Sequence, residues 1–190
     1  MKNTKNILWA LPLFSVLLFT SCEKDDPKVP NEEELITTLI YTLTPQGGGT
    51  AVEFRFEDLD GDGGNAPVVT NGVLAANTTY SGVIILANDI ENPSVIISEE
   101  VEEEAEEHQF FYRFSTFFLS GGFEYADSDA NGNPIGLLTT FETPDSQSGL
   151  TLTITLRHEP DKTASGVALG LIDHAGGETD IEVTFDVTVQ

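Results

Sequence analysis

The sequence predicts an all-β fold, an antiparallel β-sandwich of eight or nine strands with an immunoglobulin-like architecture. Two observations support this prediction. Apolar residues recur at every second position in several stretches, which is the period of a strand with one face in the core. Turn-forming Gly, Asn, Asp and Pro residues separate these stretches at short intervals, as they do in β-sandwiches. A closed barrel is the alternative architecture.

Three stretches show the alternation most clearly. They are residues 52–56, 150–156 and 181–189, with the sequences VEFRF, LTLTITL and IEVTFDVTV. We expect their apolar side chains in the core and the intervening Glu, Thr and Asp side chains in water. Less regular strand candidates are 35–43, 79–87, 94–97, 108–118, 137–141 and 167–171.

One stretch, 99–107, does not fit a strand. It contains seven Glu residues, interrupted only by Val101 and Ala105. Ile97, Val101 and Ala105 are four positions apart, so they can form one stripe of a short helix, although like charges at that spacing repel. We interpret the stretch as a solvated acidic loop or helical turn. The alternative is a patch that attracts cations or docks a partner.

The N-terminus has the features of an export signal. Lys2 and Lys5 precede an apolar run, 7–19, and the small residues Thr20 and Ser21 follow it. The run of about 13 residues is too short to span a bilayer, which takes ~20. We therefore predict that residues 1–21 are a signal peptide and take no part in the fold.

Cys22 is the only cysteine in the chain and directly follows the small residues. This arrangement resembles the bacterial lipobox, in the looser form seen in Bacteroidota, and implies a lipid attached to Cys22. Lys24, Asp25 and Asp26 resemble the signal that sends lipoproteins of that phylum to the outer face of the outer membrane. Residues 22–34 are polar and contain Pro, so we expect a lipidated flexible tether.

Composition limits the remaining chain, 35–190, which has the length of a single domain. The formal net charge of the chain is −24. This charge argues against binding to nucleic acid or to anionic lipid headgroups, both of which require Lys and Arg. With Cys22 acylated, no cysteine remains for a disulfide. We expect a monomer.

The first loop with oxygen ligands at metal spacing is 58–65, DLDGDGGN. Asp58, Asp60 and Asp62 alternate and Gly residues follow, which is how calcium loops present several oxygens to one ion. The twelfth position is Val69, where an EF-hand requires Glu, so the loop is not an EF-hand. Either this is a calcium site that borrows a carboxylate from elsewhere, or it is an acidic β-turn.

The second such loop is 127–133, DSDANGN. Asp127, Asp129 and Asn131 have the same alternate spacing, and its twelfth position, Leu138, likewise departs from the EF-hand pattern. Calcium is thus the one cofactor that the sequence suggests.

Catalytic motifs do not emerge from the sequence. His108, His158 and His174 lie at no recognised metal spacing, and we expect each to be a packed or hydrogen-bonded turn residue. The chain has no GxSxG motif, no P-loop and no dinucleotide fingerprint. We therefore predict that the protein is not an enzyme.

Four segments are similar to a group of short Bacteroidota surface lipoproteins with no established activity. They are DLDGDGGN at 58–65, EEHQFF at 106–111, LRHEPDK at 156–162 and GGETDIEVTFDVTV at 176–189. The resemblance implies a surface location. The function that we predict is a non-catalytic binding or adhesion module, stabilised by calcium, for an extracellular ligand or protein. The alternatives are a glycan- or ligand-binding subunit of an outer-membrane uptake system and, more remotely, a hydrolase.

Overall fold

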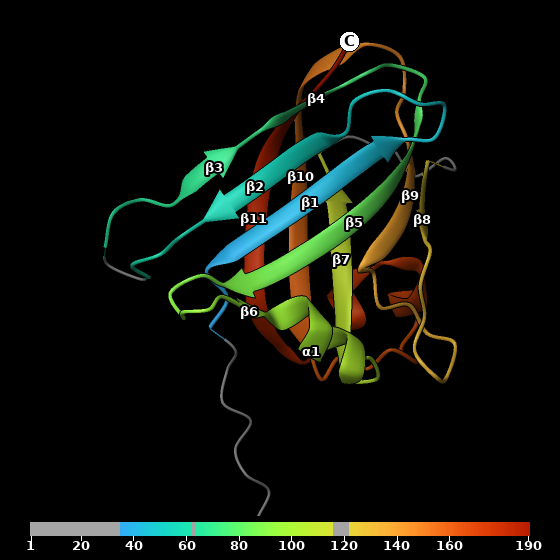
Figure 1. Ribbon diagram of the computed structural model, residues 1–190. Helices are drawn as coiled ribbons and strands as arrows, with labels where there is room; N and C mark the ends of the chain where they lie inside the picture. The colour runs from blue at the N-terminus through green and yellow to red at the C-terminus, as the bar shows by residue number, and fades with distance from the viewer. Residues whose placement is uncertain (1–34, 62–63, 116–121) are drawn as a thin grey trace, which may run out of the picture. The chain divides into compact units, whose positions relative to one another are not determined.

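The computed structural model describes residues 35–61, 64–115 and 122–190 (Figure 1). These residues belong to the second of two units of the chain, Glu33–Gln190. The predicted signal peptide and tether, with Cys22, Lys24, Asp25 and Asp26, lie outside the described residues, and so does Asp62.

Two β-sheets make up this unit. The larger sheet has the order β3-β2-β1-β5-β9-β8, with β6 paired to β5. The smaller sheet has the order β4-β11-β10-β7. Neighbouring strands are antiparallel except β4 and β11, which run parallel. The strands of the larger sheet are β1 (Thr38–Pro45), β2 (Val52–Glu57), β3 (Val68–Thr70), β5 (Thr79–Asn88), β6 (Val95–Ile96), β8 (Phe123–Tyr125) and β9 (Leu138–Glu142). The strands of the smaller sheet are β4 (Gly72–Leu74), β7 (His108–Phe114), β10 (Gln147–His158) and β11 (Glu178–Val189).

The two sheets face each other across one apolar core. Figure 1 shows β1, β2 and β5 crossing in front of β7, β10 and β11. Aromatic rings from the two sheets meet between them, at centroid distances of 5.5, 5.6 and 5.0 Å for the pairs Tyr41–Tyr112, Phe54–Phe185 and Phe114–Phe141. Such contacts bury large apolar areas and are the main stabilising element of a sandwich.

The prediction of an all-β sandwich is confirmed, and the two separate sheets exclude a closed barrel for the described residues. These residues form eleven strands, however, and not eight or nine. The strands that the sequence did not predict, β3, β4 and β8, are each three residues long, whereas β6 lies within the predicted candidate 94–97. A segment of three residues is too short to show an alternation from which a strand could be predicted.

The strand prediction for 167–171 is wrong. Val167–Leu169 forms a short 3₁₀ helix, η1, and a second one, η2 (Ile172–His174), follows it. Gly166 and Gly170 flank η1 with φ of 85° each, in the left-handed region, and this reverses the chain where a strand would continue.

The acidic stretch overlaps the one α-helix of the described residues, α1 (Ile97–Glu103). Ile97 and Val101 are buried, as the predicted stripe requires, and α1 packs against β5. The Glu side chains of the stretch face solvent, because Glu99, Glu100 and 102–104 are all exposed.

The expectation that the Thr side chains of β10 face water is wrong. Thr153 and Thr155 are only 6% and 4% exposed. Thr153 shares a 2.8 Å hydrogen bond with the hydroxyl of Thr184, and Thr155 donates to Glu182 across 3.0 Å. The two hydroxyls are covered because side chains of the neighbouring strand β11 engage them. On β11 the expectation holds, since Glu182, Thr184 and Asp186 are exposed.

Candidate functional site

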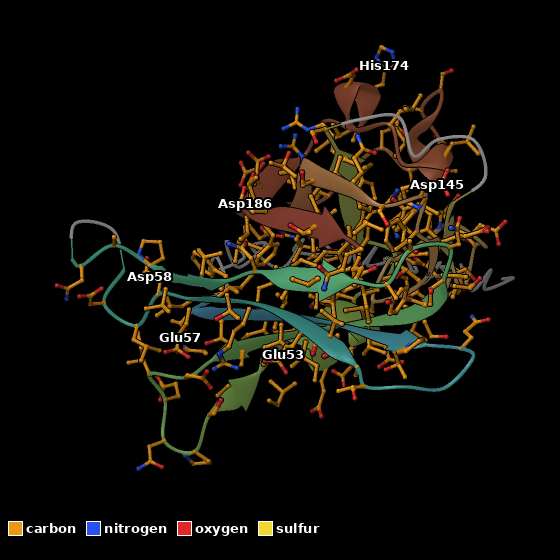
Figure 2. All side chains as sticks on the ribbon, turned by 90° about the horizontal axis from the view of Figure 1, so that it is seen from above. Glu53, Glu57, Asp58, Asp145, His174 and Asp186 are labelled. Atoms are coloured by element: carbon orange, nitrogen blue, oxygen red, sulfur yellow. The ribbon has the colours of Figure 1, made fainter. Side chains whose placement is uncertain are left out.

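The first acidic loop follows β2 and is organised by its own carboxylates. The backbone N–H of Gly61 donates to Oδ1 of Asp58 across 2.9 Å. Asn65 donates to Oδ2 of Asp60 twice, from its backbone N–H at 2.9 Å and its side-chain amide at 2.6 Å. These hydrogen bonds lower the pKa of Asp60, so its carboxylate is ionised. Figure 2 labels Asp58 at the left end of the larger sheet, directly after β2.

The second acidic loop also uses its carboxylates to hold backbone. Asp127 accepts the N–H groups of Gly136 at 2.7 Å and Leu138 at 2.8 Å. Oδ1 of Asp129 accepts the N–H groups of Asn131 and Asn133, each at 2.9 Å. Asn131 itself is exposed, and it contributes this N–H group to the loop.

A lysine side chain reaches the second loop from elsewhere in the sequence. Nζ of Lys162 donates to Oδ2 of Asp129 at 3.1 Å and to the carbonyl oxygens of Ala105 at 2.5 Å and Pro134 at 3.1 Å. A lysine ammonium has three donors, and all three are used. One carboxylate and two carbonyls are also the oxygens that Ca²⁺ takes in proteins. The Lys162 ammonium therefore supplies the positive charge that balances the Asp129 carboxylate.

The pKa values of Asp129 and Lys162 are both lowered, but for different reasons. Burial opposes the ionisation of Asp129, but the hydrogen bonds from Asn133, Lys162 and Asn131 together outweigh it and hold the pKa of Asp129 below its ordinary value. Burial lowers the pKa of Lys162, and the neighbouring Asp129 acts in the opposite sense. Both groups are buried, and each is the partner of the other's charge.

A cleft of about 430 Å³ lies beside β7. Residues 111–114 of β7 and the adjacent Ser115 line one side, and residues 169–173, which extend into η2, line the other. Figure 1 shows the orange-red turns that carry these residues beside β7. Phe123 of β8, Thr155 of β10 and Glu182 of β11 complete the described lining. Residues 116–121, which follow β7, lie outside the described residues.

The cleft combines exposed apolar side chains with a few charged groups. Leu169 is 80% exposed and Leu171 49% exposed, both at the cleft. Arg113 is exposed on β7, and Asp173 and Glu182 bring carboxylates to the same cleft. An apolar pocket with few polar groups is the usual form of a small-molecule site. Sequence patterns did not predict it, because 167–171 was assigned to a strand.

The turn segment that forms one side of the cleft is fixed to the smaller sheet. The side-chain amide of Gln109, which is fully buried, donates to the carbonyl oxygen of Val167 across 2.9 Å. Phe111, Val167 and Ala175 form a small apolar cluster there. Arg157 donates to the carbonyl oxygens of Gly176 and Gly177 at 2.6 and 2.9 Å.

A third group of polar side chains meets where β7 begins and β10 ends. His108 and His158 are opposite each other in the register of these strands. Their rings are stacked, with centroids 4.8 Å apart and planes 12° apart. Glu107 and Glu159, one residue beyond each strand, join His158 there. His174 is remote from this group in the chain and is exposed on η2 (Figure 2).

No described helix is both long and apolar enough to cross a membrane. Comparisons of the chain with protein families, with curated proteins and with solved structures found no match.

Proposed function

We propose that the protein is a lipid-anchored, non-catalytic binding module displayed on the outer face of the outer membrane, and that the cleft beside β7 holds its ligand. The proposed anchor is the acyl group on Cys22, and Lys24, Asp25 and Asp26 are the proposed export signal. The tether 22–34 would separate the folded unit from the membrane surface.

The observation on which the proposed binding role rests is the composition of the cleft. Its volume of about 430 Å³ falls within the range of roughly 300–1,000 Å³ typical of small-ligand sites. Leu169 and Leu171 leave apolar surface in solvent at the cleft, and covering such surface with an apolar ligand is favourable. The proposed ligand is therefore a small molecule with an apolar body.

Arg113 defines the polar end of the proposed ligand. Residues 35–190 contain four basic residues, of which Arg55 pairs with Glu57, Arg157 holds backbone carbonyls and Lys162 is buried beside Asp129. Arg113 is the one that lines the cleft. A guanidinium group at an apolar wall suits a ligand with an anionic or hydroxyl end.

A glycan ligand, the alternative suggested by the sequence, has less support. Sugar rings stack on exposed aromatic faces, and the chain has four tyrosines. Tyr41, Tyr80 and Tyr112 are at most 9% exposed, and the hydroxyl of the partly buried Tyr125 donates to the carbonyl oxygen of Phe110. The only tryptophan of the chain, Trp9, lies in the predicted signal peptide. An apolar ligand therefore fits the described surface better than a sugar.

Two fluorescent probes test the cleft in a protein of residues 22–190. The change Cys22→Ser removes the acylation site, so this protein has no acyl chain. N-phenyl-1-naphthylamine is uncharged and apolar, and 8-anilinonaphthalene-1-sulfonate adds an anionic group. We expect both to bind the folded protein. The pair Leu169→Ser with Leu171→Ser should weaken both probes, whereas Arg113→Gln should weaken only the sulfonate.

The matched control is Val83→Ser with Ile85→Ser. Both residues are aliphatic, 41% exposed, and lie on β5 of the other sheet. These changes should leave the binding of both probes unaltered. The proposal is wrong if the β5 pair weakens binding as much as the leucine pair does, or if the folded protein binds neither probe.

A further inference from the structure

Two strand ends bring three metal-ligand side chains together. Glu107 precedes β7, and His158 and Glu159 lie where β10 ends. The backbone N–H of Glu159 donates to the carbonyl oxygen of Glu107 across 2.7 Å, which fixes the two backbones to each other. One carboxylate oxygen from each glutamate and one ring nitrogen of His158 all lie within 4.8 Å of one another. Nε2 of His158 is 3.8 Å from Oε2 of Glu107.

The separation of these atoms suits a small metal ion after a modest side-chain movement. Zn²⁺ binds His nitrogen and carboxylate oxygen at about 2.0–2.2 Å, so its tetrahedral ligands lie roughly 3.3 Å from one another. Glu107 and Glu159 are exposed, so their side chains can rotate inward without repacking the core. Three protein ligands would leave the fourth position of a tetrahedral ion for water.

The histidine ligand is held in place more firmly than the two glutamates. The side chain of His158 is only 14% exposed, and its ring lies against that of His108. The Nδ1 atom of His108 is 3.2 Å from the carbonyl oxygen of Glu104. The ring of His158 is thus packed against a second ring that itself contacts the backbone.

A close backbone contact fixes the turn that carries His158 and Glu159. Glu159 has a φ of 48°, in the left-handed region, which directs the chain sharply away from β10. A side chain at Gly177 would collide with the carbonyl oxygen of His158, so glycine is required there. The positions of both ligands therefore depend on this packing.

The charges around the three side chains favour a cation. Glu102, Glu103, Glu104 and Glu106 are exposed in the segment that leads to Glu107. Carboxylates gathered on one surface raise the local concentration of cations. An acidic surface alone would not select among divalent ions, but an imidazole ligand does, because it prefers Zn²⁺ and similar ions to Ca²⁺ or Mg²⁺.

From this geometry we propose that Glu107, His158 and Glu159 form a site for one divalent transition-metal ion of the Zn²⁺ type. The site uses no residue of the cleft or of the two Asp-rich loops, although Glu107 lines one pocket with Ser128, Asp129 and Ala130 of the second loop. It does not depend on the proposed binding role. Its chemistry is that of two carboxylates and one imidazole around one ion.

Titration calorimetry of the full-length protein in non-ionic detergent tests the site with ZnCl₂, CaCl₂ and MgCl₂. We expect zinc binding at one site per chain that millimolar Ca²⁺ or Mg²⁺ does not displace. Glu107→Gln with Glu159→Gln should lower the zinc affinity by at least about tenfold, the size of effect seen when groups that support a metal are removed. Both residues are exposed, so this variant should fold, and circular dichroism checks that it does.

Two matched controls separate the site from the general acidity of the chain. Glu103→Gln with Glu106→Gln removes the same amount of charge, from the segment that leads to Glu107, and should leave the zinc affinity unchanged. His158→Gln should abolish binding, whereas His174→Gln, at an exposed histidine elsewhere, should not. Equal losses from the two glutamine pairs would overturn the proposal, and so would zinc binding that survives His158→Gln or a folded protein that binds no zinc.

Discussion

The ammonium group of Lys162 lies 3.1 Å from Oδ2 of Asp129, and the two side chains are only 4% and 1% exposed. These residues are 33 positions apart in the sequence. Through its other two hydrogen bonds, Lys162 also holds the carbonyl oxygens of Ala105 and Pro134. One side chain thus connects the end of the acidic stretch, the second acidic loop and the segment after β10.

Removal of this charge should destabilise the fold strongly. Lys162→Met keeps an aliphatic chain of similar length but leaves Asp129 buried without its cationic partner. Breaking a buried ion pair on one side costs about 3–5 kcal/mol. We expect a loss of that size in the free energy of unfolding, measured by urea denaturation of the Cys22→Ser protein.

The double variant Lys162→Met with Asp129→Asn is the internal control. It removes both charges, so its loss of stability should be smaller than the sum of the two single losses. A Lys162→Met variant that loses less than about 1 kcal/mol would show that the pair is not a structural element.

Calcium, if it stabilises the protein, should act at the first acidic loop. There the described hydrogen bonds to the carboxylates of Asp58 and Asp60 come from residues of the same loop, whereas Lys162 already supplies positive charge to the second loop. Calcium at about 100 times its Kd would add roughly 2.7 kcal/mol, and each kcal/mol raises the melting temperature of a domain of this size by about 2–4 °C. We therefore expect thermal unfolding to shift upward by about 5–10 °C when millimolar calcium replaces EDTA.

The paired changes Asp60→Asn with Asp62→Asn should remove this shift and leave the response to sodium chloride intact, because salt acts by general screening. Asp127→Asn should lower the melting temperature, since Asp127 holds two backbone N–H groups, without changing the calcium shift. A calcium shift that depends on Asp127 would contradict this assignment.

Acid should destabilise the protein through His108. Burial, partly offset by the hydrogen bond to the carbonyl oxygen of Glu104, lowers its pKa below the ordinary value of 6.5. As pH falls below 6.5, the unfolded chain binds a proton at this residue before the folded chain does, so stability decreases until the folded pKa is passed. Urea denaturation at pH 7 and pH 5 measures the decrease.

His108→Gln should make the difference in stability between pH 7 and pH 5 smaller, and the matched change His174→Gln, at an exposed residue, should leave it as it is. The same pH dependence in both variants would exclude His108 as its source. At lower pH, Asp129 should contribute in the same direction, because a carboxyl with a depressed pKa loses its stabilising effect as pH falls through that pKa.

The sequence predicts the long strands well because their alternation is regular. Phe54, Ile154 and Phe185, each assigned to the core from period two, are fully buried. The pattern cannot predict which outward side chains become covered, because this depends on contacts between strands. Thr153 on β10 is buried, whereas Thr184, its hydrogen-bond partner on β11, is exposed.

The polar clusters could not be predicted from local spacing, because each is assembled across the fold. His158 meets Glu107 only through the register of β7 and β10, and no HxH or HxxxH pattern marks the pair. The sequence offers one indication that Lys162 has a special role, because it is one of four basic residues in a strongly acidic domain. A lone lysine of this kind is a candidate for an internal ion pair, but its partner depends on the tertiary structure.

Exposure at the cell surface is the central claim, and it rests on Cys22 with Lys24, Asp25 and Asp26. The most direct measurement is the fate of the folded unit when intact cells are treated with an external protease, followed by immunoblotting of whole cells and of the membrane fraction. Cys22→Ala is the control for anchoring and should release the protein from the membranes, because the acyl chains contribute ~0.8 kcal/mol per buried CH₂.

We predict that the protease removes the folded unit of the unchanged protein. The variant with Lys24, Asp25 and Asp26 replaced by Ala should remain in the membrane fraction but be protected from the protease. An unchanged protein that stays intact on whole cells, and is digested only after the outer membrane is broken, would contradict the account.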